Sequence, residues 1–455
     1  MANVAPDVTG RVFPRLPPEL TQLIARYLHP NEIATSFRPI NKAAAAQFPA
    51  HTVIRLSQPV PPHAFAAHWL APGATRGLNL CRRKLLLRLT AASGVVANLE
   101  IAFQATGLLP LHAARAAFKG ATQAGSLECF RFLAERVAEF HPGAMGDAVC
   151  SAAHAGHKHL LEWARSARCS QGWYCAFPRF AAAREAASGG HPELADWILQ
   201  PLRDDPAVDS FHVEQSWLIV STAEGCDLAA LQHRIQTGGW GRLFENDEAR
   251  KVLVVRAAAG SPTPDWAAKV EWLEAQGCPR SSSATPEAAK RPDALARLTW
   301  LQNRESFVGA DAVEAAARAG NVAALQYLLA VVPAEQSRAS IKAAKGGHLA
   351  ALQVLHAAGW EVRPRDAALT AVRAGHLHVL AWLVEALGAE AVQLDDALFA
   401  AAAESGSVEL LAWLRERGCP WGALVLAGAA QSGCEEAVEW LLEQGYPREV
   451  SCGWM

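Results

Sequence analysis

The 455-residue chain is predicted to be all-α, an α-solenoid of helix–turn–helix repeats, because one motif recurs in it at a regular spacing. The motif is A-A-x-x-G, followed after two to four residues by an apolar block that often ends in Trp-Leu. Its glycines lie 27 to 35 residues apart, with one gap of 60 residues, and such a period is typical of solenoid repeats. These glycines are Gly94, Gly125, Gly156, Gly190, Gly225, Gly260, Gly320, Gly347, Gly375, Gly406 and Gly433.

The N-terminal segments lack this motif. We expect residues 1–12 to be disordered and residues 13–50 to form a helical module, in which Pro17-Pro18 starts a helix. Residues 51–80 contain SQPVPPHAF, a proline-rich stretch typical of a connector. The apolar face of the first helix is expected to comprise Leu20, Leu23, Ile24, Tyr27 and Leu28.

Residues 81–447 are predicted to contain about twelve repeat units, each made of two helices. The first helix is short and alanine-rich and ends at the motif glycine, which can adopt the left-handed conformation. The second helix has apolar residues at i, i+3, i+4 and i+7, and in one unit it ends at Gly418-Cys419-Pro420, where proline prevents its continuation. One helix pair cannot bury its apolar face alone, so neighbouring units are expected to stack and share a core.

The repeat pattern is weakest around residues 225–305. The gap of 60 residues spans two periods and contains EAAKRPDALARLTWLQ, a degenerate copy with Asp293 in place of the glycine. The unit at Gly260 carries a five-residue insertion. We expect this segment to be the least stable part of the array and the first to exchange its amide hydrogens. Residues 448–455 are expected to be a C-terminal tail.

An aromatic residue lies seven positions after the motif glycine in many units. Because its placement is periodic, we interpret it as a core packing residue rather than a ligand contact. The same reasoning assigns Cys278 and Cys419, which lie in equivalent G-C-P turns, to the repeat structure rather than to catalysis. The aromatic residues are Phe132, Trp163, Trp197, Tyr327, Trp382, Trp413 and Trp440.

Composition narrows the class of protein. The formal net charge of −2 argues against a general nucleic-acid binder, which usually carries a basic stripe. The ten cysteines form no C-x-x-C pair and are expected to be reduced thiols, which favours a cytoplasmic or nuclear location. We expect no secretory signal, since the N-terminus lacks an apolar run, and no membrane span.

The common catalytic and cofactor-binding motifs are missing from the sequence. The sequence contains no G-x-x-x-x-G-K-[ST], G-x-G-x-x-G, G-x-S-x-G or H-E-x-x-H pattern, so we expect no enzyme activity and no cofactor. The best metal candidate is Cys150-x3-His154-x2-His157-x-His159. His157 occupies the G-H position that recurs in other units, so hydrogen bonding at the turn is favoured over a metal site.

The repeat units resemble ankyrin repeats. Ala371, Gly375, His376 and the leucines that follow match the helix–turn–helix part of that family, A-A-x-x-G-H-x-x-x-[LV]-x-W-L. Many periods here are shorter than the family's 33 residues, and its T-P-L-H start is absent, so the hairpin fingers are expected to be short or missing. The resemblance implies a protein-binding concave groove lined by the first helices. Its matching leucines are Leu377, Leu380 and Leu383.

Charged residues recur two positions before the motif glycine, where this resemblance places the groove. Arg318, Lys345 and Arg373 occupy the position in three successive units, and Glu404 occupies it in the next. A groove of mixed charge suits a protein target better than a phosphate backbone. A second basic cluster, CRRKLLLRL, begins at Cys81 and is expected to present a solvated basic helix face.

Residues 13–50 resemble an F-box, the helical module that docks on the adaptor subunit of a cullin–RING ubiquitin ligase. Residues 41–46, Asn-Lys followed by four alanines, depart from the family's usual ending. The resemblance implies that Leu16, Pro17, Leu20, Ile24 and Leu28 contact the adaptor. The matching positions are Leu16, Pro17, Glu19, Leu20, Ile24, Leu28, Pro30, Ile33, Phe37 and Ile40.

Together these features predict a non-catalytic substrate receptor of a ubiquitin ligase, whose repeat array binds the target. The alternative is a stand-alone ankyrin-repeat scaffold for protein–protein interactions. In that case residues 13–50 only cap the N-terminal end of the array.

Overall fold

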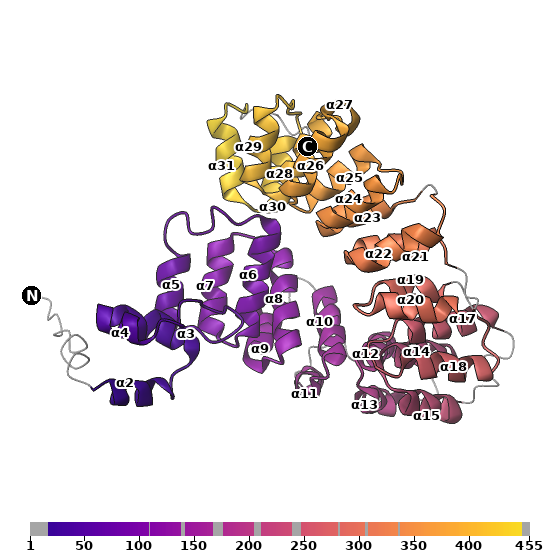
Figure 1. Ribbon diagram of the computed structural model, residues 1–455. Helices are drawn as coiled ribbons and strands as arrows, with labels where there is room; N and C mark the ends of the chain where they lie inside the picture. The colour runs from indigo at the N-terminus through magenta and orange to yellow at the C-terminus, as the bar shows by residue number, and fades with distance from the viewer. Residues whose placement is uncertain are drawn as a thin grey trace, which may run out of the picture. The chain divides into compact units, whose positions relative to one another are not determined.

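A computed structural model describes residues 17–447, apart from residues 109, 138–141, 167–175, 204–210, 239–246, 281–282, 305–307 and 335–336. Across these residues every regular element is a helix and no strand is present, which confirms the all-α prediction (Figure 1). The expected disorder of residues 1–12, the adaptor contact Leu16 and the tail 448–455 lie outside the described residues.

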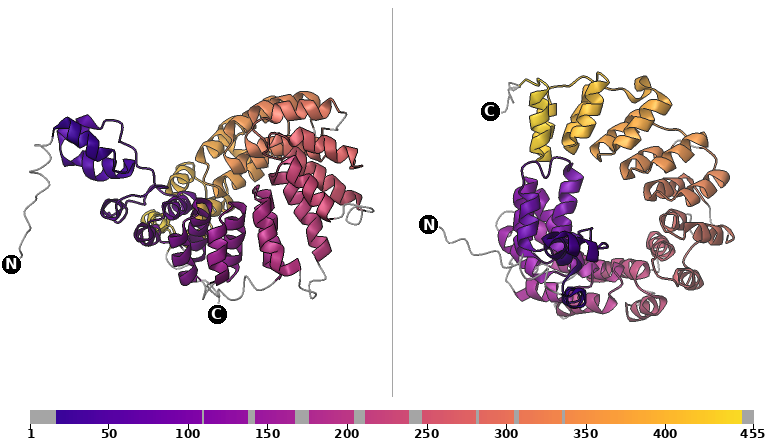
Figure 2. Two further views of the ribbon diagram at one scale, coloured as in Figure 1. Left: turned by 90° about the horizontal axis from the view of Figure 1, so that it is seen from below. Right: turned by 60° about the vertical axis from the view of Figure 1, so that its left-hand side comes forward.

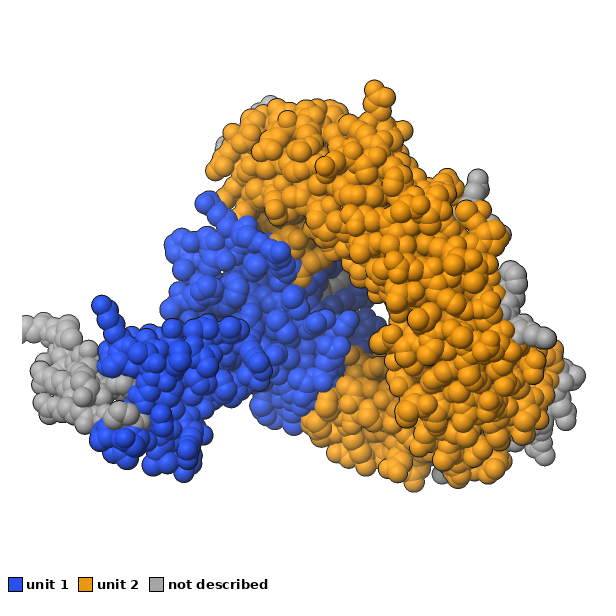
Figure 3. All heavy atoms as spheres, viewed as in Figure 1, with its two compact units in different colours: residues 1–78, 82–148 blue, residues 79–81, 149–455 orange. Residues whose placement is uncertain are grey.

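The chain forms two compact units (Figure 3). The first comprises residues 1–78 and 82–148, and the second comprises residues 79–81 and 149–455. The first unit therefore combines the N-terminal module with the first helices of the region expected to carry the repeats.

The N-terminal module has a small core of its own, built from Ala25, Ile33 and Phe48. Buried Asn31 holds the loop of residues 55–59 against the module. Its side-chain amide donates to the backbone carbonyls of Arg55, Gln58 and Pro59 at 2.8–3.2 Å. The elements are α2 (Pro18–Ala25), α3 (Pro30–Glu32), the π-helical turn η2 (Ile33–Phe37), the 3₁₀ turn η3 (Arg38–Ile40) and α4 (Lys42–Gln47).

The remainder of the first unit consists of longer helices that pack pairwise. The expected solvated basic face of CRRKLLLRL is wrong at Arg83, whose side chain is buried. Its guanidinium donates to the carbonyls of Leu78, Thr106 and Thr75, so it pairs backbone acceptors that burial would otherwise leave unsatisfied. The helices are α5 (Pro62–Trp69), α6 (Leu80–Ala92), α7 (Val96–Thr106), α8 (Pro110–Ala124) and α9 (Leu127–Val137).

The second unit is a succession of helix pairs, and α10 (Pro142–His154) with α11 (Lys158–Ser166) leads into it. From α12 onward, each first helix packs against the first helix of the next pair (Figure 2). The first helices are α12 (Ala176–Ser188), α14 (Phe211–Gly225), α17 (Glu248–Ala259), α19 (Ala284–Ala289), α21 (Ala310–Ala319), α23 (Ala339–Gly346), α25 (Pro364–Arg373), α28 (Asp396–Ser405) and α30 (Val425–Ser432).

The second helices pack against their own partners, and several also contact one another. They are α13 (Pro192–Arg203), α15 (Leu228–Gly238), α18 (Trp266–Ala275), α20 (Ala294–Gln302), α22 (Val322–Val331), α24 (Leu349–Ala357), α26 (Leu377–Leu387), α29 (Val408–Glu416) and α31 (Glu435–Glu443). The short helix α27 (Ala389–Val392) lies between two pairs. The degenerate copy around Asp293 thus folds as the pair α19–α20.

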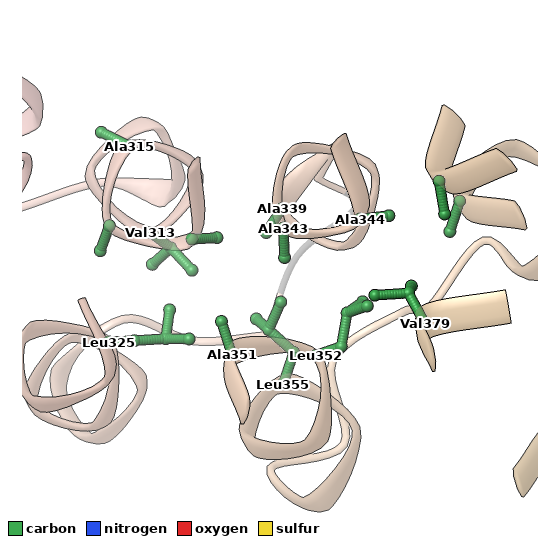
Figure 4. Packing of buried hydrophobic residues seen from close by; sticks show 14 of the residues in the cluster. Val313, Ala315, Leu325, Ala339, Ala343, Ala344, Ala351, Leu352, Leu355 and Val379 are labelled. Carbon is green, nitrogen blue, oxygen red and sulfur yellow. The ribbon is translucent and has the colours of Figure 1, made fainter. Parts of the chain in front are cut away.

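Alanines of the first helices pack against leucines of the second helices in the core. Figure 4 shows Ala343 of α23 above Leu352 and Leu355 of α24, and all three side chains are buried. A methyl side chain lets adjacent helices approach closely while still excluding water, which accounts for the recurrent buried alanine pair.

Motif glycines end several first helices in the left-handed conformation. Gly347 has φ +70°, and a Cβ placed there would lie 2.8 Å from the ring of His376 in the next pair. The His376 Nε2 donates to the carbonyl of Lys345 at 3.3 Å. This repeat histidine therefore bonds to the turn of the preceding helix pair.

The periodic aromatic residues are partly buried, and Tyr327, Trp382, Trp413 and Trp440 pack against the edge of the core without being fully enclosed by it. Trp413 packs one side against the core, while the guanidinium of Arg417 lies 3.7 Å from its ring centroid. A cation over the ring covers a face that the helix layers leave open. Periodicity located this position correctly but did not specify how deeply it is buried.

Candidate recognition surfaces

Helix α2 turns most of its apolar residues toward solvent. Leu20, Leu23 and Ile24 are 45%, 47% and 40% exposed, and Tyr27, in the turn after the helix, is 85% exposed. The residues that α2 buries are small, Thr21 and Ala25.

Of the remaining predicted adaptor contacts, one is exposed to solvent and one packs against the small core of the module. Pro17 is exposed, whereas Leu28 packs against the core cluster of the module. Leu28 thus serves the module's own fold, while Pro17, Leu20 and Ile24 remain accessible to a partner. Other exposed apolar residues of this segment are Ile40, Val53 and Ile54.

The four predicted groove residues occupy equivalent positions on successive first helices. Each directly follows the pair of small buried residues, as Lys345 follows Ala343-Ala344. Side chains at this position reach their neighbours, since the Arg373 Nε lies 3.4 Å from the Glu404 Oε2. Within the described part of the chain, Arg318 and Lys345 are exposed and form no ion pair.

The residue that directly follows the two buried small residues can also be identified on other first helices, which adds further members to the four predicted groove residues. We call the extended set the charge row, and it is His154, Ser188, Glu224, Gly260, Lys290, Arg318, Lys345, Arg373 and Glu404. Sequence reasoning missed Glu224 and Lys290 because it counted from the glycine. In the degenerate units the glycine is shifted or replaced, whereas the buried pair keeps its place.

A pocket of ≈ 330 Å³ lies along the charge row, between α14, α17 and α19. Gly260 holds the row position on α17, and a Cβ there would lie 2.8 Å from the Glu287 Cβ. The row thus has no side chain at this position, where Glu287 of α19 approaches the backbone of Gly260 closely. The pocket is lined by Val220, Glu224, Leu253, Arg256, Ala257, Gly260 and Glu287.

The two carboxylates of this pocket have opposite environments. Partial burial raises the pKa of Glu224, and repulsion by Glu287 and Glu185 adds to the effect. Burial also acts to raise the pKa of Glu287, but hydrogen bonds from Lys290 and Arg256 outweigh it and lower the pKa. The Arg256 Nε donates to Glu287 Oε1 at 2.9 Å.

The histidine and cysteine candidates are occupied with packing and hydrogen bonds. His154 Nδ1 lies 3.2 Å from the Ser188 Oγ, and the rings of His157 and His159 meet edge to face. No group of three or more potential metal ligands occurs among the described residues. Burial raises the pKa of Cys278 and of Cys419 to about 12, which disfavours the nucleophilic thiolate at neutral pH.

In the described residues, no helix is both long and apolar enough to cross a bilayer. Comparison of the chain with protein-family models finds no matching family. Comparison with curated proteins finds no similar sequence. Any assignment of function therefore has to come from the residues and surfaces themselves.

Proposed function

We propose that this protein is a non-catalytic recognition protein, the substrate receptor of a cullin–RING ubiquitin ligase. Its helix pairs act as an ankyrin-like solenoid whose charge row contacts a target protein. Its F-box-like N-terminal module docks on the adaptor subunit of the ligase.

The observation that carries this proposal is the exposed apolar face of α2. Leu20, Leu23 and Ile24 are spaced to lie along one side of α2, and an apolar stripe facing solvent usually marks an interface. A helix that only capped the repeats would bury these side chains against them. The exposure therefore favours docking over capping.

The proposal is tested by co-purification of the full chain with the ligase adaptor. Docking through a helix face concentrates its energy in a few apolar anchors. We expect Leu20→Ala combined with Ile24→Ala to weaken adaptor binding by at least about 2 kcal/mol, a loss of roughly thirtyfold in affinity. Because both side chains are exposed, the melting temperature should hardly change.

The matched control is Leu424→Ala, which removes an exposed leucine of the second unit. It should leave adaptor binding unchanged. If the wild type never co-purifies with the adaptor, or the double variant co-purifies equally well, the ligase role is wrong. The protein would then be a stand-alone scaffold, which is the second candidate function.

A further inference from the structure

The charge row is interrupted at Gly260, and the interruption coincides with a pocket. The neighbouring row positions on α14 and α19 carry Glu224 and Lys290. Gly260 lets Glu287 of α19 approach closely, since a Cβ there would lie 2.8 Å from the Glu287 Cβ, and both residues line a pocket of ≈ 330 Å³. A pocket of this size can accommodate one long side chain of a partner.

The pocket contains a carboxylate without a counter-ion. Glu287 is bound by both Arg256 and Lys290, so its charge is satisfied. Glu224 forms no hydrogen bond or ion pair within the described part of the chain. Because Arg256 and Lys290 both bind Glu287, the second carboxylate of the pocket, Glu224, has no bound cation of its own.

The protein gains no stability from this arrangement. The raised pKa of Glu224 means that the folded state disfavours its negative charge, owing to partial burial and the nearby carboxylates. His154 and Lys290 offset the effect only in part. Charges that are unfavourable in the free protein are often retained because a ligand uses them.

The remaining wall of the pocket is apolar. Val220 of α14 and Leu253 and Ala257 of α17 line it beside the carboxylate. This combination matches a side chain with an aliphatic stem and a cationic end, because the stem can contact the wall while the end reaches the carboxylate. A metal ion would use only the charge and would leave the apolar wall without a role.

We propose that this pocket binds the side chain of a lysine or arginine from a partner protein, with Glu224 as its counter-ion. The inference rests on the proposed recognition function and specifies the chemistry that the charge row selects. Glu224 supplies the attraction, the Arg256–Glu287 pair forms a neutral wall, and Gly260 lets Glu287 lie close to α17.

The test uses the full chain and two peptides that differ only in the ammonium group. One is acetyl-Gly-Lys-Gly-amide, and the other carries norleucine in place of lysine. Binding is measured by titration calorimetry or by ligand-observed NMR. The lysine peptide should bind saturably, Glu224→Gln should weaken it at least about tenfold, and the norleucine peptide should bind at least about tenfold more weakly than the lysine peptide. The control Glu193→Gln, at an exposed position on α13, should change nothing.

Two further readouts separate a binding role from a structural one. Glu224→Gln should melt at the same temperature as the wild type or higher, because it removes an unfavourable charge. Calorimetry in buffers of different ionisation enthalpy should show proton release on binding just above pH 4.5, the ordinary pKa of a glutamate. A free amine such as butylamine should bind more weakly than the lysine peptide if the site is built for a protein side chain.

Several outcomes would overturn the inference. These are a lysine peptide that does not bind, equal binding of the lysine and norleucine peptides, unaltered binding by Glu224→Gln, and butylamine binding as tightly as the lysine peptide. None of them bears on adaptor co-purification, which depends on α2 and which Glu224→Gln should leave intact. Failure of this inference can therefore be distinguished from failure of the proposed ligase role.

Discussion

Lys269 and Arg297 are buried cations at a position that other units fill with an aliphatic residue. Each lies three residues before a tryptophan on its second helix, as do Val379 and Leu410 in regular units. The Lys269 Nζ donates to the carbonyls of Ala223 and Cys226 and to the Ser261 hydroxyl, all at 2.7–2.8 Å. Their hydrogen bonds compensate for burial and tie each second helix to the preceding pair.

We expect Lys269→Met to destabilise the protein. Methionine fills a similar volume but leaves two buried carbonyls without donors, which costs about 1–3 kcal/mol. The loss should appear as a lower melting temperature, and Lys345→Met, at an exposed lysine, should not show it. A Lys269→Met variant at least as stable as the wild type would mean that the cost of burying the ammonium exceeds the value of its hydrogen bonds.

The same residue predicts a pH dependence. Burial lowers the pKa of Lys269 from 10.5 to about 8, so between these values the unfolded chain binds more protons than the folded one. Stability contributed by this group should therefore rise with pH across that window. The pKa of Lys269 also responds to the charges of Cys226, Asp265, Asp227 and Arg297. The difference in unfolding free energy between wild type and Lys269→Met across this pH window therefore isolates the contribution of Lys269.

At the scale of the element, the weak segment 225–305 has features of both instability and reinforcement. Its helix α19 has six residues, and Gly260 ends α17 with φ −84° rather than in the left-handed conformation. Yet the Arg297 Nη1 donates to the carbonyls of Ala259 and Ser261, at the C-terminal end of α17. The last turns of α14 and α17 thus have donors for carbonyls that a helix end leaves free.

Hydrogen exchange can separate the two influences. The sequence alone predicts that residues 225–305 exchange first. The buried cations lead us to expect that the last turn of α17 is protected at least as well as the last turn of α21. Arg297→Met should lower protection at the end of α17 by at least about tenfold while leaving α23 unaffected, since units contact only their neighbours. Early exchange of α17 in both proteins would restore the expectation from sequence.

At the scale of the whole molecule, periodicity predicted the helix pairs but not the features that depend on neighbouring helices. The A-A-x-x-G phase located α21 to α31 because regular glycines end most of those first helices. The glycine phase missed Glu224 and Lys290. In those two units the glycine is displaced or replaced, and only the two buried small residues remain at their usual position in the helix. Periodicity also overestimated the burial of Trp413, because recurrence indicates a shared environment without defining it. The pocket at Gly260 needed three helices in place before it could be recognised.

Charges of opposite sign at different positions of the charge row predict the charge pattern of the target segment. The pocket at α14, α17 and α19 would bind a cation, whereas Arg318 on α21 and Lys345 on α23 present exposed positive charges. Adjacent helices pack about 8–10 Å apart, so two to three spacings separate the two regions by about 16–30 Å. An extended chain covers that distance in roughly five to nine residues. We therefore expect a target segment with a basic residue and an acidic residue about that far apart.

Selection of random extended peptides on the full chain checks this spacing. Wild-type protein should enrich peptides with a basic and an acidic residue roughly five to nine positions apart. Arg318→Glu combined with Lys345→Glu should remove the preference for the acidic residue and keep the preference for the basic one. Arg373 is left unchanged because it already pairs with Glu404, so its reversal would add repulsion. The control reverses exposed Arg131 and Arg338, outside the row, with the same change in net charge. If both double variants alter selection alike, net charge rather than the charge row determines binding, and the recognition surface lies elsewhere on the second unit.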